Sequence, residues 1–251
     1  MERLAMRAGW LATLLPQGWP LRTSTLITGP GGSGKPLIGN LVAASWLEQG
    51  GSVVFMSLQY PGPEFIAAGL QKVAGVDVAA HAGRAAYLEL DTSLDGLEEP
   101  TGVRLRANLV KPQVWDEGIE RACALVSDRG PGVLVMGSAL NLLLFSRTYG
   151  TAILDRMKRT IRDDKRRTYV FSVSSTAKKD MIDQLEAVAD NLFVARSTRR
   201  PFRIFMRIER MRDVPFLPDE VEVPIASDTL EEVKEIADYS RRRVIPEVSA
   251  L

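Results

Sequence analysis

The residues best suited to chemistry form a glycine-rich stretch near the start of the chain. Residues 29–35 fit the phosphate-binding pattern G-x-x-x-x-G-K. Glycines let a backbone pass close to a phosphate, and the amides at the start of a helix point toward an anion. The lysine adds a mobile positive charge for the outer phosphates. The predicted nucleotide-binding residues are Gly29, Gly31, Gly32, Ser33, Gly34, Lys35 and Pro36.

Pro36 departs from this pattern, because a serine or threonine is expected after the lysine to place a hydroxyl on Mg²⁺. Proline also removes one backbone N–H, although it is tolerated in the first turn of a helix. We therefore expect ATP or ADP as the ligand, with little or no role for Mg²⁺. The alternative is a glycine-rich turn between a strand and a helix that binds nothing.

The elements around this stretch alternate along the chain. Apolar strands are predicted at 24–28, 53–58, 87–90, 132–136, 168–173 and 191–195, and helices at 8–16, 35–49, 62–75, 112–128, 148–166 and 178–188. Such alternation is typical of a parallel sheet covered on both faces. Ligands bind such sheets at the carboxyl ends of the strands.

The end of the chain has a different pattern. Residues 202–208 and 220–225 alternate with period two, which predicts antiparallel strands, whereas 91–110 are predicted to be an irregular connection. The expected fold is α/β, a three-layer αβα arrangement with a mostly parallel sheet and antiparallel C-terminal edge strands. We expect one domain over 1–226, with a helix and turn in 1–20. A helix capped by Asp228 and Glu231, with a tail, follows in 227–251.

Composition excludes several classes of protein. One cysteine, Cys123, and one histidine, His81, rule out an internal disulfide, a zinc cluster and a histidine-based triad. The longest apolar run, residues 133–145, is too short to cross a bilayer, and the first residues lack a signal-peptide layout. We expect a cytoplasmic protein that does not enter a membrane.

A net charge of +1 hides a basic block followed by an acidic tail. Residues 153–212 hold 16 Lys and Arg against 8 Asp and Glu, while residues 213–251 hold 4 against 10. On one helix, Arg156, Lys158, Arg159, Arg162 and Arg166 would form a positive face. Three interpretations stay open: a solvated face, a surface for nucleic acid, or a contact with an acidic partner. Such a partner could be the tail of a second copy, with Asp228, Glu231, Glu232, Glu235 and Asp238.

Three stretches together resemble the KaiC-like branch of the RecA superfamily of phosphate-loop ATPases, including RadA paralogues. They are residues 18–35, residues 53–61, and residues 189–193 with Arg203-Ile204-Phe205-Met206-Arg207-Ile208-Glu209-Arg210-Met211-Arg212. The resemblance implies a hexamer or filament that binds ATP between subunits. The family's lysine and arginine that reach a neighbour's phosphate fall on Arg210 and Arg212. Two cations one residue apart on a strand would also project to the same face.

The catalytic positions of that family are altered here. Its two glutamates fall on Gln59 and Tyr60, and its metal-associated (Walker B) aspartate falls on Gly137. Neither Gln59 nor Tyr60 can take a proton from water at neutral pH. We expect weak or absent hydrolysis, no catalytic residue, no metal site, and a regulatory or assembly role. Two alternatives are an active DNA-binding ATPase with a substitute base from Asp91, Glu64 or Glu89, and a DNA-binding scaffold indifferent to nucleotide.

Overall fold

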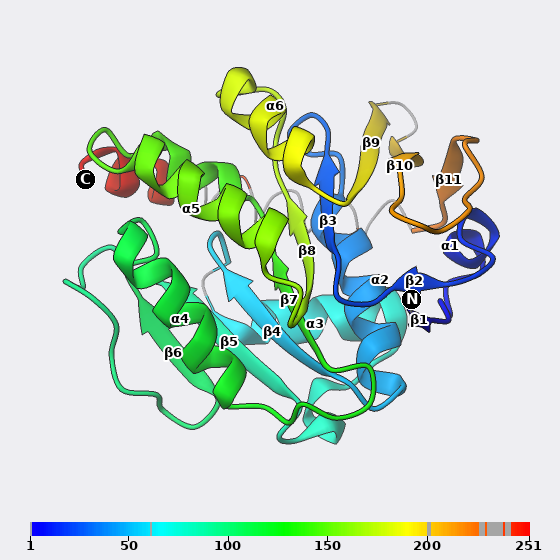
Figure 1. Ribbon diagram of the computed structural model, residues 1–251, viewed down its shortest axis with the longest axis horizontal. Helices are drawn as coiled ribbons and strands as arrows, with labels where there is room; N and C mark the ends of the chain where they lie inside the picture. The colour runs from blue at the N-terminus through cyan, green and yellow to red at the C-terminus, as the bar shows by residue number, and fades with distance from the viewer. Residues whose placement is uncertain (1, 61, 200–201, 226–228, 230–237, 239–241) are drawn as a thin grey trace.

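The computed structural model describes residues 2–60, 62–199, 202–225, 229, 238 and 242–251. A nine-stranded sheet forms its centre, in the order β11-β10-β9-β3-β8-β7-β4-β5-β6 (Figure 1). The strands are β3 (Ser24–Thr28), β4 (Ser52–Ser57), β5 (Ala85–Leu90), β6 (Arg104–Ala107), β7 (Val133–Gly137), β8 (Thr168–Ser172), β9 (Asn191–Arg199), β10 (Phe202–Arg210) and β11 (Val221–Val223). Neighbouring strands from β9 to β6 are parallel, while β10 is antiparallel to both β9 and β11. The mostly parallel sheet with antiparallel edge strands is confirmed.

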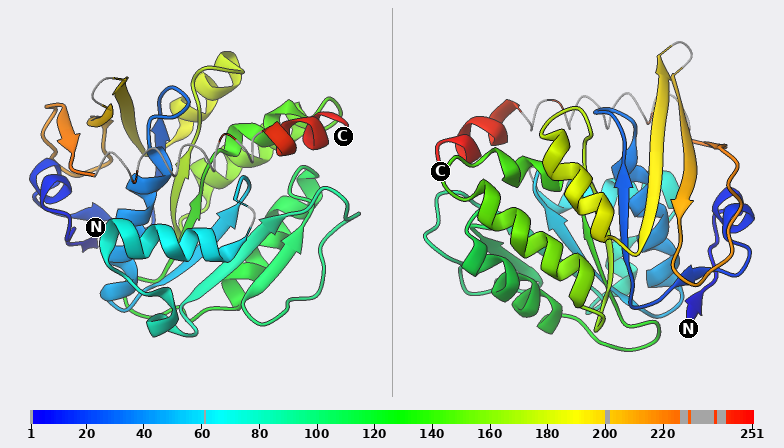
Figure 2. Two further views of the ribbon diagram at one scale, coloured as in Figure 1. Left: turned by 180° about the vertical axis from the view of Figure 1, so that it is seen from behind. Right: turned by 45° about the horizontal axis from the view of Figure 1, so that its top comes forward.

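Helices cover both faces of the sheet, which confirms the three-layer αβα arrangement (Figures 1 and 2). One face carries α2 (Lys35–Glu48) and α3 (Pro63–Ala74), with α1 (Gly9–Leu14) near the β11 edge. The other carries α4 (Pro112–Ala124), α5 (Gly150–Asp163) and α6 (Lys179–Val188). Each face has its own apolar core. The smaller elements are β1 (Arg3–Leu4), which pairs with β2 (Trp19–Pro20), and the 3-10 helices η1 (Val78–His81) and η2 (Leu140–Phe145).

Amphipathic spacing explains why the covering helices form where they do. In α5, the buried residues Ile153, Leu154, Met157 and Ile161 recur at helical intervals along one stripe. The helix ends at Asp163, three residues before the end that the sequence predicted. Asp164 ends it, because its carboxylate accepts a hydrogen bond from the backbone N–H of Arg166 (3.0 Å) and forms a local turn.

Two further predictions need correction. The region 91–110 is not wholly irregular, since it contains the edge strand β6, in which Leu105 and Ala107 are buried and the two arginines are exposed. The last predicted helix runs past Arg243, because residues 242–249 are helical, and Val244 and Val248 pack into the core of the α4–α6 face. The proposed cap at Asp228 and Glu231 lies outside the described residues. In the described parts of the chain, none of the helices combines the length and the apolar character needed to cross a membrane.

Candidate functional site

The phosphate loop (residues 29–35) connects β3 to α2 and lies at the carboxyl end of β3 (Figure 1). Gly29 has φ +142°, and a Cβ there would lie 2.0 Å from the carbonyl oxygen of Ala195 in β9, so only glycine fits. Gly32 and Gly34 also have positive φ, and Gly34 caps α2 in the left-handed conformation. Pro36 is accommodated in the first turn of α2, as expected. The predicted strand, loop and helix are therefore all present.

Lys35 is the charged group of this loop, and it is only 6% exposed. Its ammonium donates to the carbonyl oxygens of Gly29 (3.0 Å) and Pro30 (2.6 Å) and to the hydroxyl of Ser33 (2.9 Å). The Gly29 oxygen also accepts from the backbone N–H of Ser175 (2.9 Å), so it keeps a donor if the lysine moves. The lysine thus rests on its own loop, where a phosphate oxygen could replace these carbonyls as a stronger acceptor.

The altered catalytic positions come together at the neighbouring strand ends. β4 pairs with β7, with Met56 opposite Gly137. Gln59, 5% exposed, places its side-chain nitrogen 3.5 Å from the Ser138 hydroxyl. Half-buried Tyr60 lines a cavity of about 30 Å³ whose other lining residues are mostly apolar and include no acid. A cavity of this size has room for about one or two waters.

The sequence resemblance placed the family's metal-associated aspartate at Gly137, and the space beside this glycine is filled. A Cβ on Gly137 would lie 2.7 Å from Leu140 Cδ1 and 3.0 Å from Phe171 Cδ1. A larger side chain could enter only if the side chains of Leu140 and Phe171 shifted. Together with the missing hydroxyl at Pro36, these residues do not fit Mg²⁺. Within the described residues, no cluster of three His, Cys, Asp or Glu side chains could hold a metal.

The acids considered as substitute bases are engaged elsewhere or exposed. Glu89 is the second-last residue of β5, and Asp91 directly follows this strand, which three strands separate from β3. Glu89 pairs with Arg104 (2.9 Å) and Asp91 with Arg106. Burial alone raises the pKa of Asp91, but hydrogen bonds from Ser93 and Arg106 bring it below the usual carboxyl value. Glu64 is exposed in the first turn of α3.

The predicted phosphate sensors Arg210 and Arg212 lie at the opposite end of the sheet from the phosphate loop. Arg210 pairs with Leu192 near the start of β9, and its guanidinium donates to the carbonyl oxygens of Glu186 and Ala189 (2.8 Å for Ala189), which end α6. Arg212 lies past the end of β10, and the register shifts between Ile208 and Arg210. The expectation that both project from one strand face was therefore wrong. Both side chains have partners within the chain.

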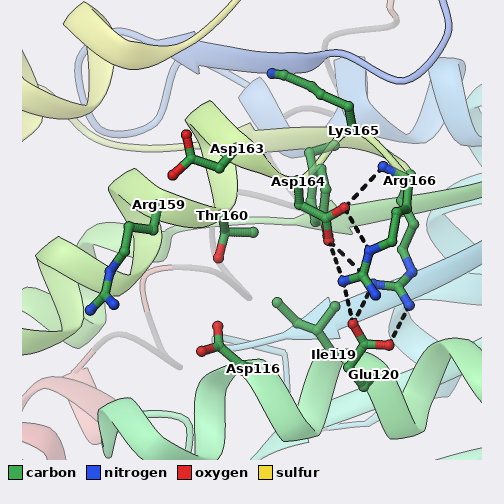
Figure 3. Close-up of a pocket in the computed structure, with 11 residues that line it drawn as sticks. Asp116, Ile119, Glu120, Arg159, Thr160, Asp163, Asp164, Lys165 and Arg166 are labelled. Carbon is green, nitrogen blue, oxygen red and sulfur yellow. Dashed lines mark hydrogen bonds and ion pairs between the residues drawn. The ribbon is translucent and has the colours of Figure 1, made fainter.

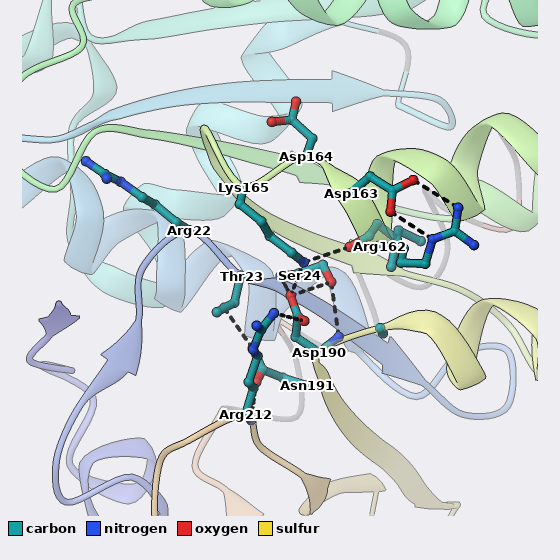
Figure 4. A network of polar contacts seen from close by, with 12 residues as sticks. Arg22, Thr23, Ser24, Arg162, Asp163, Asp164, Lys165, Asp190, Asn191 and Arg212 are labelled. Carbon is teal, nitrogen blue, oxygen red and sulfur yellow. Dashed lines mark hydrogen bonds and ion pairs between the residues drawn. The ribbon is translucent and has the colours of Figure 1, made fainter. Parts of the chain in front are cut away.

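Asp190 is the centre of the contacts around Arg212 (Figure 4). Its carboxylate accepts from the backbone N–H (2.9 Å) and hydroxyl (3.2 Å) of Ser24, from Lys165 and from Arg212 (2.9 Å). Burial alone would raise the pKa of Asp190, but these donors hold it below the usual carboxyl value. Asn191 joins the same network, since it donates to Thr23 (2.9 Å) and Thr25 (3.0 Å). This network ties the starts of β3 and β9 to the end of β10.

The predicted basic face is largely neutralised. Arg156 pairs with Asp116 (2.7 Å), Lys158 with Asp155 (3.5 Å), Arg162 with Asp163 (2.8 Å), and Arg166 with Glu120 and Asp164 (3.0 Å). Arg166 lies beyond α5, so the five cations do not share one helix. Of the five, Arg159 and Arg166 line a cavity of about 420 Å³ between α4, α5 and the start of β8 (Figure 3). In this cavity Glu120 and Asp164 bridge Arg166 and Arg167. Of the predicted acidic tail, Asp228, Glu231, Glu232 and Glu235 lie outside the described residues.

The β8–α6 loop (residues 173–178) also belongs to this site, although no residue of it was predicted from the sequence. Ser175 donates its backbone N–H to Gly29, which places this loop against the phosphate loop. The side chain of Asn141 in η2 accepts from the backbone N–H of Ser174 (2.9 Å), which joins the loop to the end of β7. The run of hydroxyl residues directly after the strand at 168–173 was the available signal.

The geometry can be compared with known proteins. A KaiC-like protein from the hyperthermophilic archaeon Pyrococcus horikoshii OT3 has a similar structure, with a TM-score of 0.66 over 90% of this chain and 96% of that chain, at 14% sequence identity. No family model and no curated protein matches the sequence. The chain therefore has a KaiC-like RecA fold, as the sequence resemblance implied.

Proposed function

We propose that this RecA-like domain binds a nucleoside di- or triphosphate in the phosphate loop without a bridging Mg²⁺. It hydrolyses the nucleotide weakly or not at all, and it works as a regulatory or assembly module. Three observations support binding: the strand–loop–helix geometry, the buried Lys35, and the KaiC-like fold. One observation carries the loss of catalysis: Leu140 and Phe171 fill the space beside Gly137.

Each residue then has a limited role. The loop amides and Lys35 hold the phosphates. The Gln59 side chain can donate to or accept from a water, but it cannot remove a proton at neutral pH. Bound nucleotide therefore acts as a structural ligand, which stabilises the state that binds it.

Assembly remains part of the proposal. Arg210 and Arg212 lie at the end of the sheet remote from their own phosphate loop, so they can serve a nucleotide only on a neighbouring copy. A head-to-tail hexamer or filament would bring the two ends together. Arg212 would then have to release Asp190, and Arg210 the last carbonyls of α6.

The alternative of an active, DNA-binding ATPase has less support. Four of its five predicted DNA-binding cations have a carboxylate partner within the chain, and for Arg159 no such partner lies among the described residues. Neutralised cations release few counterions and contribute little to DNA affinity.

Calorimetric titration of the whole chain with ATP and with ADP, in Mg²⁺ and in EDTA, tests the proposal. We expect equal affinity in both conditions, and a loss of about tenfold or more in Lys35→Ala, which equals about 1.4 kcal/mol. Lys179→Ala is the matched control, since Lys179 is exposed and pairs with Asp183 (2.7 Å). Absence of binding would favour the nucleotide-independent scaffold. Tight binding only in Mg²⁺, with turnover that Lys35→Ala abolishes, would establish an ATPase.

A further inference from the structure

The β8–α6 loop lies where the outer phosphate of a bound nucleotide is expected. β8 is the neighbour of β3, so the residues that follow these strands lie side by side (Figure 1). The backbone bond from Ser175 to Gly29 (2.9 Å) fixes this contact. Three residues further along the chain is Lys178, directly before α6.

Lys178 has a strained backbone. Its φ of 58° and ψ of 37° are left-handed, a conformation that costs about 1–2 kcal/mol for a residue with a Cβ. Ala139, which follows β7, has nearly the same angles, φ 57° and ψ 39°. Among the described residues, four non-glycine positions have positive φ, and these two lie at the phosphate end. Retained strain of this kind is typical of functional sites.

Among the ion pairs of the described residues, Lys178 has no carboxylate partner, unlike most of the cations at the other end of the sheet. It is exposed, and its described contact is with the ring of Phe145, whose centroid lies 5.6 Å from the ammonium. A cation–π contact at an exposed site contributes about 0.5–1 kcal/mol, less than a charge-assisted bond to phosphate. The lysine can therefore exchange the ring for an anion at little cost. The strand ends around it, at 58–60, 138–139 and 173–177, carry no acid, and the nearest acid along the chain is Asp180 in the first turn of α6.

We propose that Lys178 contacts the outermost phosphate of a bound nucleoside triphosphate and supplies the positive charge that Mg²⁺ brings in ordinary phosphate-loop sites. This inference rests on the proposed function. It explains how a triphosphate is accepted at a site that has lost the serine or threonine hydroxyl and the carboxylate that support the metal. It also predicts that the protein distinguishes ATP from ADP without metal, because only the triphosphate extends to the β8–α6 loop.

The test is titration of the whole chain with ATP and ADP in EDTA, for wild type, Lys178→Ala, Lys178→Gln, Lys178→Arg and the control Lys179→Ala. We expect Lys178→Ala and Lys178→Gln to weaken ATP binding about tenfold and ADP binding less than about twofold. Lys178→Arg should retain most of the ATP affinity, and Lys179→Ala should equal wild type. Thermal unfolding without nucleotide should be nearly unchanged in all four, because alanine and glutamine meet the same backbone strain as lysine.

The outcomes separate the two proposals. Wild-type binding with no effect of the Lys178 variants, or with equal losses for ATP and ADP, overturns the role of Lys178 and leaves the proposed function intact. Failure of the wild type to bind either nucleotide overturns both. If Lys179→Ala loses as much ATP affinity as Lys178→Ala, the effect comes from the general positive charge of this region. That outcome also overturns the specific contact of Lys178.

Discussion

The two ends of the central sheet carry opposite distributions of charge. At the amino ends of β3, β8 and β9, carboxylates are held by several donors each: Asp190 by Ser24, Lys165 and Arg212, and Asp164 by Arg166, Arg167 and Tyr169. At the carboxyl ends of β3, β4, β7 and β8, the loops carry Lys35 and Lys178 and no acid. The amino end is thus balanced within the chain, whereas the loops at the phosphate end are basic by sequence, which is the charge that the proposed ligand requires.

Because of this difference, the charged groups that stabilise the fold and those proposed to bind a ligand lie at opposite ends of the sheet. A carboxylate with several donors is expensive to disturb, because its partners remain behind as partly buried charges. A lysine ammonium that contacts carbonyl groups or an aromatic ring loses little interaction energy when it exchanges them for an anion. The same fold therefore uses its acids to fix strand positions at the amino end, whereas the loops directly after β3, β4, β7 and β8 carry none.

The largest effect is expected from a substitution that places an acid at the phosphate end of the sheet. We expect Gly137→Asp to destabilise the fold by about 3 kcal/mol or more, because the side chain would overpack against Leu140 and Phe171 and place a charge among apolar groups. Urea unfolding followed by circular dichroism measures the loss. Pro36→Ser is the matched control, since it adds the hydroxyl that the pattern expects after the lysine, makes no steric conflict at Gly137 and should fold normally.

The restored acid should also fail to restore hydrolysis. Phosphate release in Mg²⁺ by Gly137→Asp, alone or with Gln59→Glu, is expected to stay at background. A stable, Mg²⁺-dependent ATPase obtained from these substitutions would show that the site is only one or two residues from activity and that its packing is no obstacle.

An intermediate effect is expected from removing an acid at the amino end. Asp190→Asn should lower the free energy of unfolding by about 2 kcal/mol near neutral pH, as hydrogen bonds to charged groups contribute about 1.5–3 kcal/mol. Because the pKa of Asp190 in the folded chain lies below its ordinary value of 3.8, its contribution is full above that value and is lost as the pH falls further. The difference between wild type and variant should therefore shrink as the pH falls below about 4.

Asp163→Asn is the control for this experiment, because Asp163 is exposed and pairs only locally with Arg162 (2.8 Å). It should change stability little at any pH. If the two variants behaved alike, the network around Asp190 would have no special role in holding β3 and β9.

Local signals in the sequence were sufficient for the strand–loop–helix at residues 24–48 and for the mostly parallel sheet. The stretch Gly29–Lys35 could be recognised because its pattern depends on backbone conformation and chain neighbours. The positions assigned to the family's catalytic acids stay a prediction. What fills the space beside Gly137 could not be predicted, since Leu140 and Phe171 reach it from η2 and β8. The partners of Arg210 could not be predicted for the same reason, because they are carbonyls at the end of a different element.

For the basic block, residues 153–212, the sequence likewise did not reveal the partners of the charged side chains. A charge pattern predicts which residues are cationic, but it does not show which acids fold against them. Glu120 on α4 is distant in sequence from Arg166 and Arg167, yet it binds both. The cations predicted to form a positive helix face make ion pairs in the structure. These pairs lie within α5, between α5 and α4, and between α4 and the residues just before β8.

The smallest expected effect tests that network directly. Arg166 is 67% exposed, so Arg166→Ala should cost about 0.5 kcal/mol or less. Arg167→Ala should be clearly more harmful, because Arg167 is 13% exposed and its loss leaves the half-buried acids Glu120 and Asp164 with fewer donors. Binding of duplex DNA, measured by fluorescence anisotropy across a salt series, should be weak and unchanged by Arg166→Ala or Arg159→Ala. A steep decrease of DNA affinity with salt that either substitution reduces would mean that the ion pairs open and the cations bind phosphates. Positive charge at the amino end of the sheet would then also serve binding, as proposed for the phosphate end.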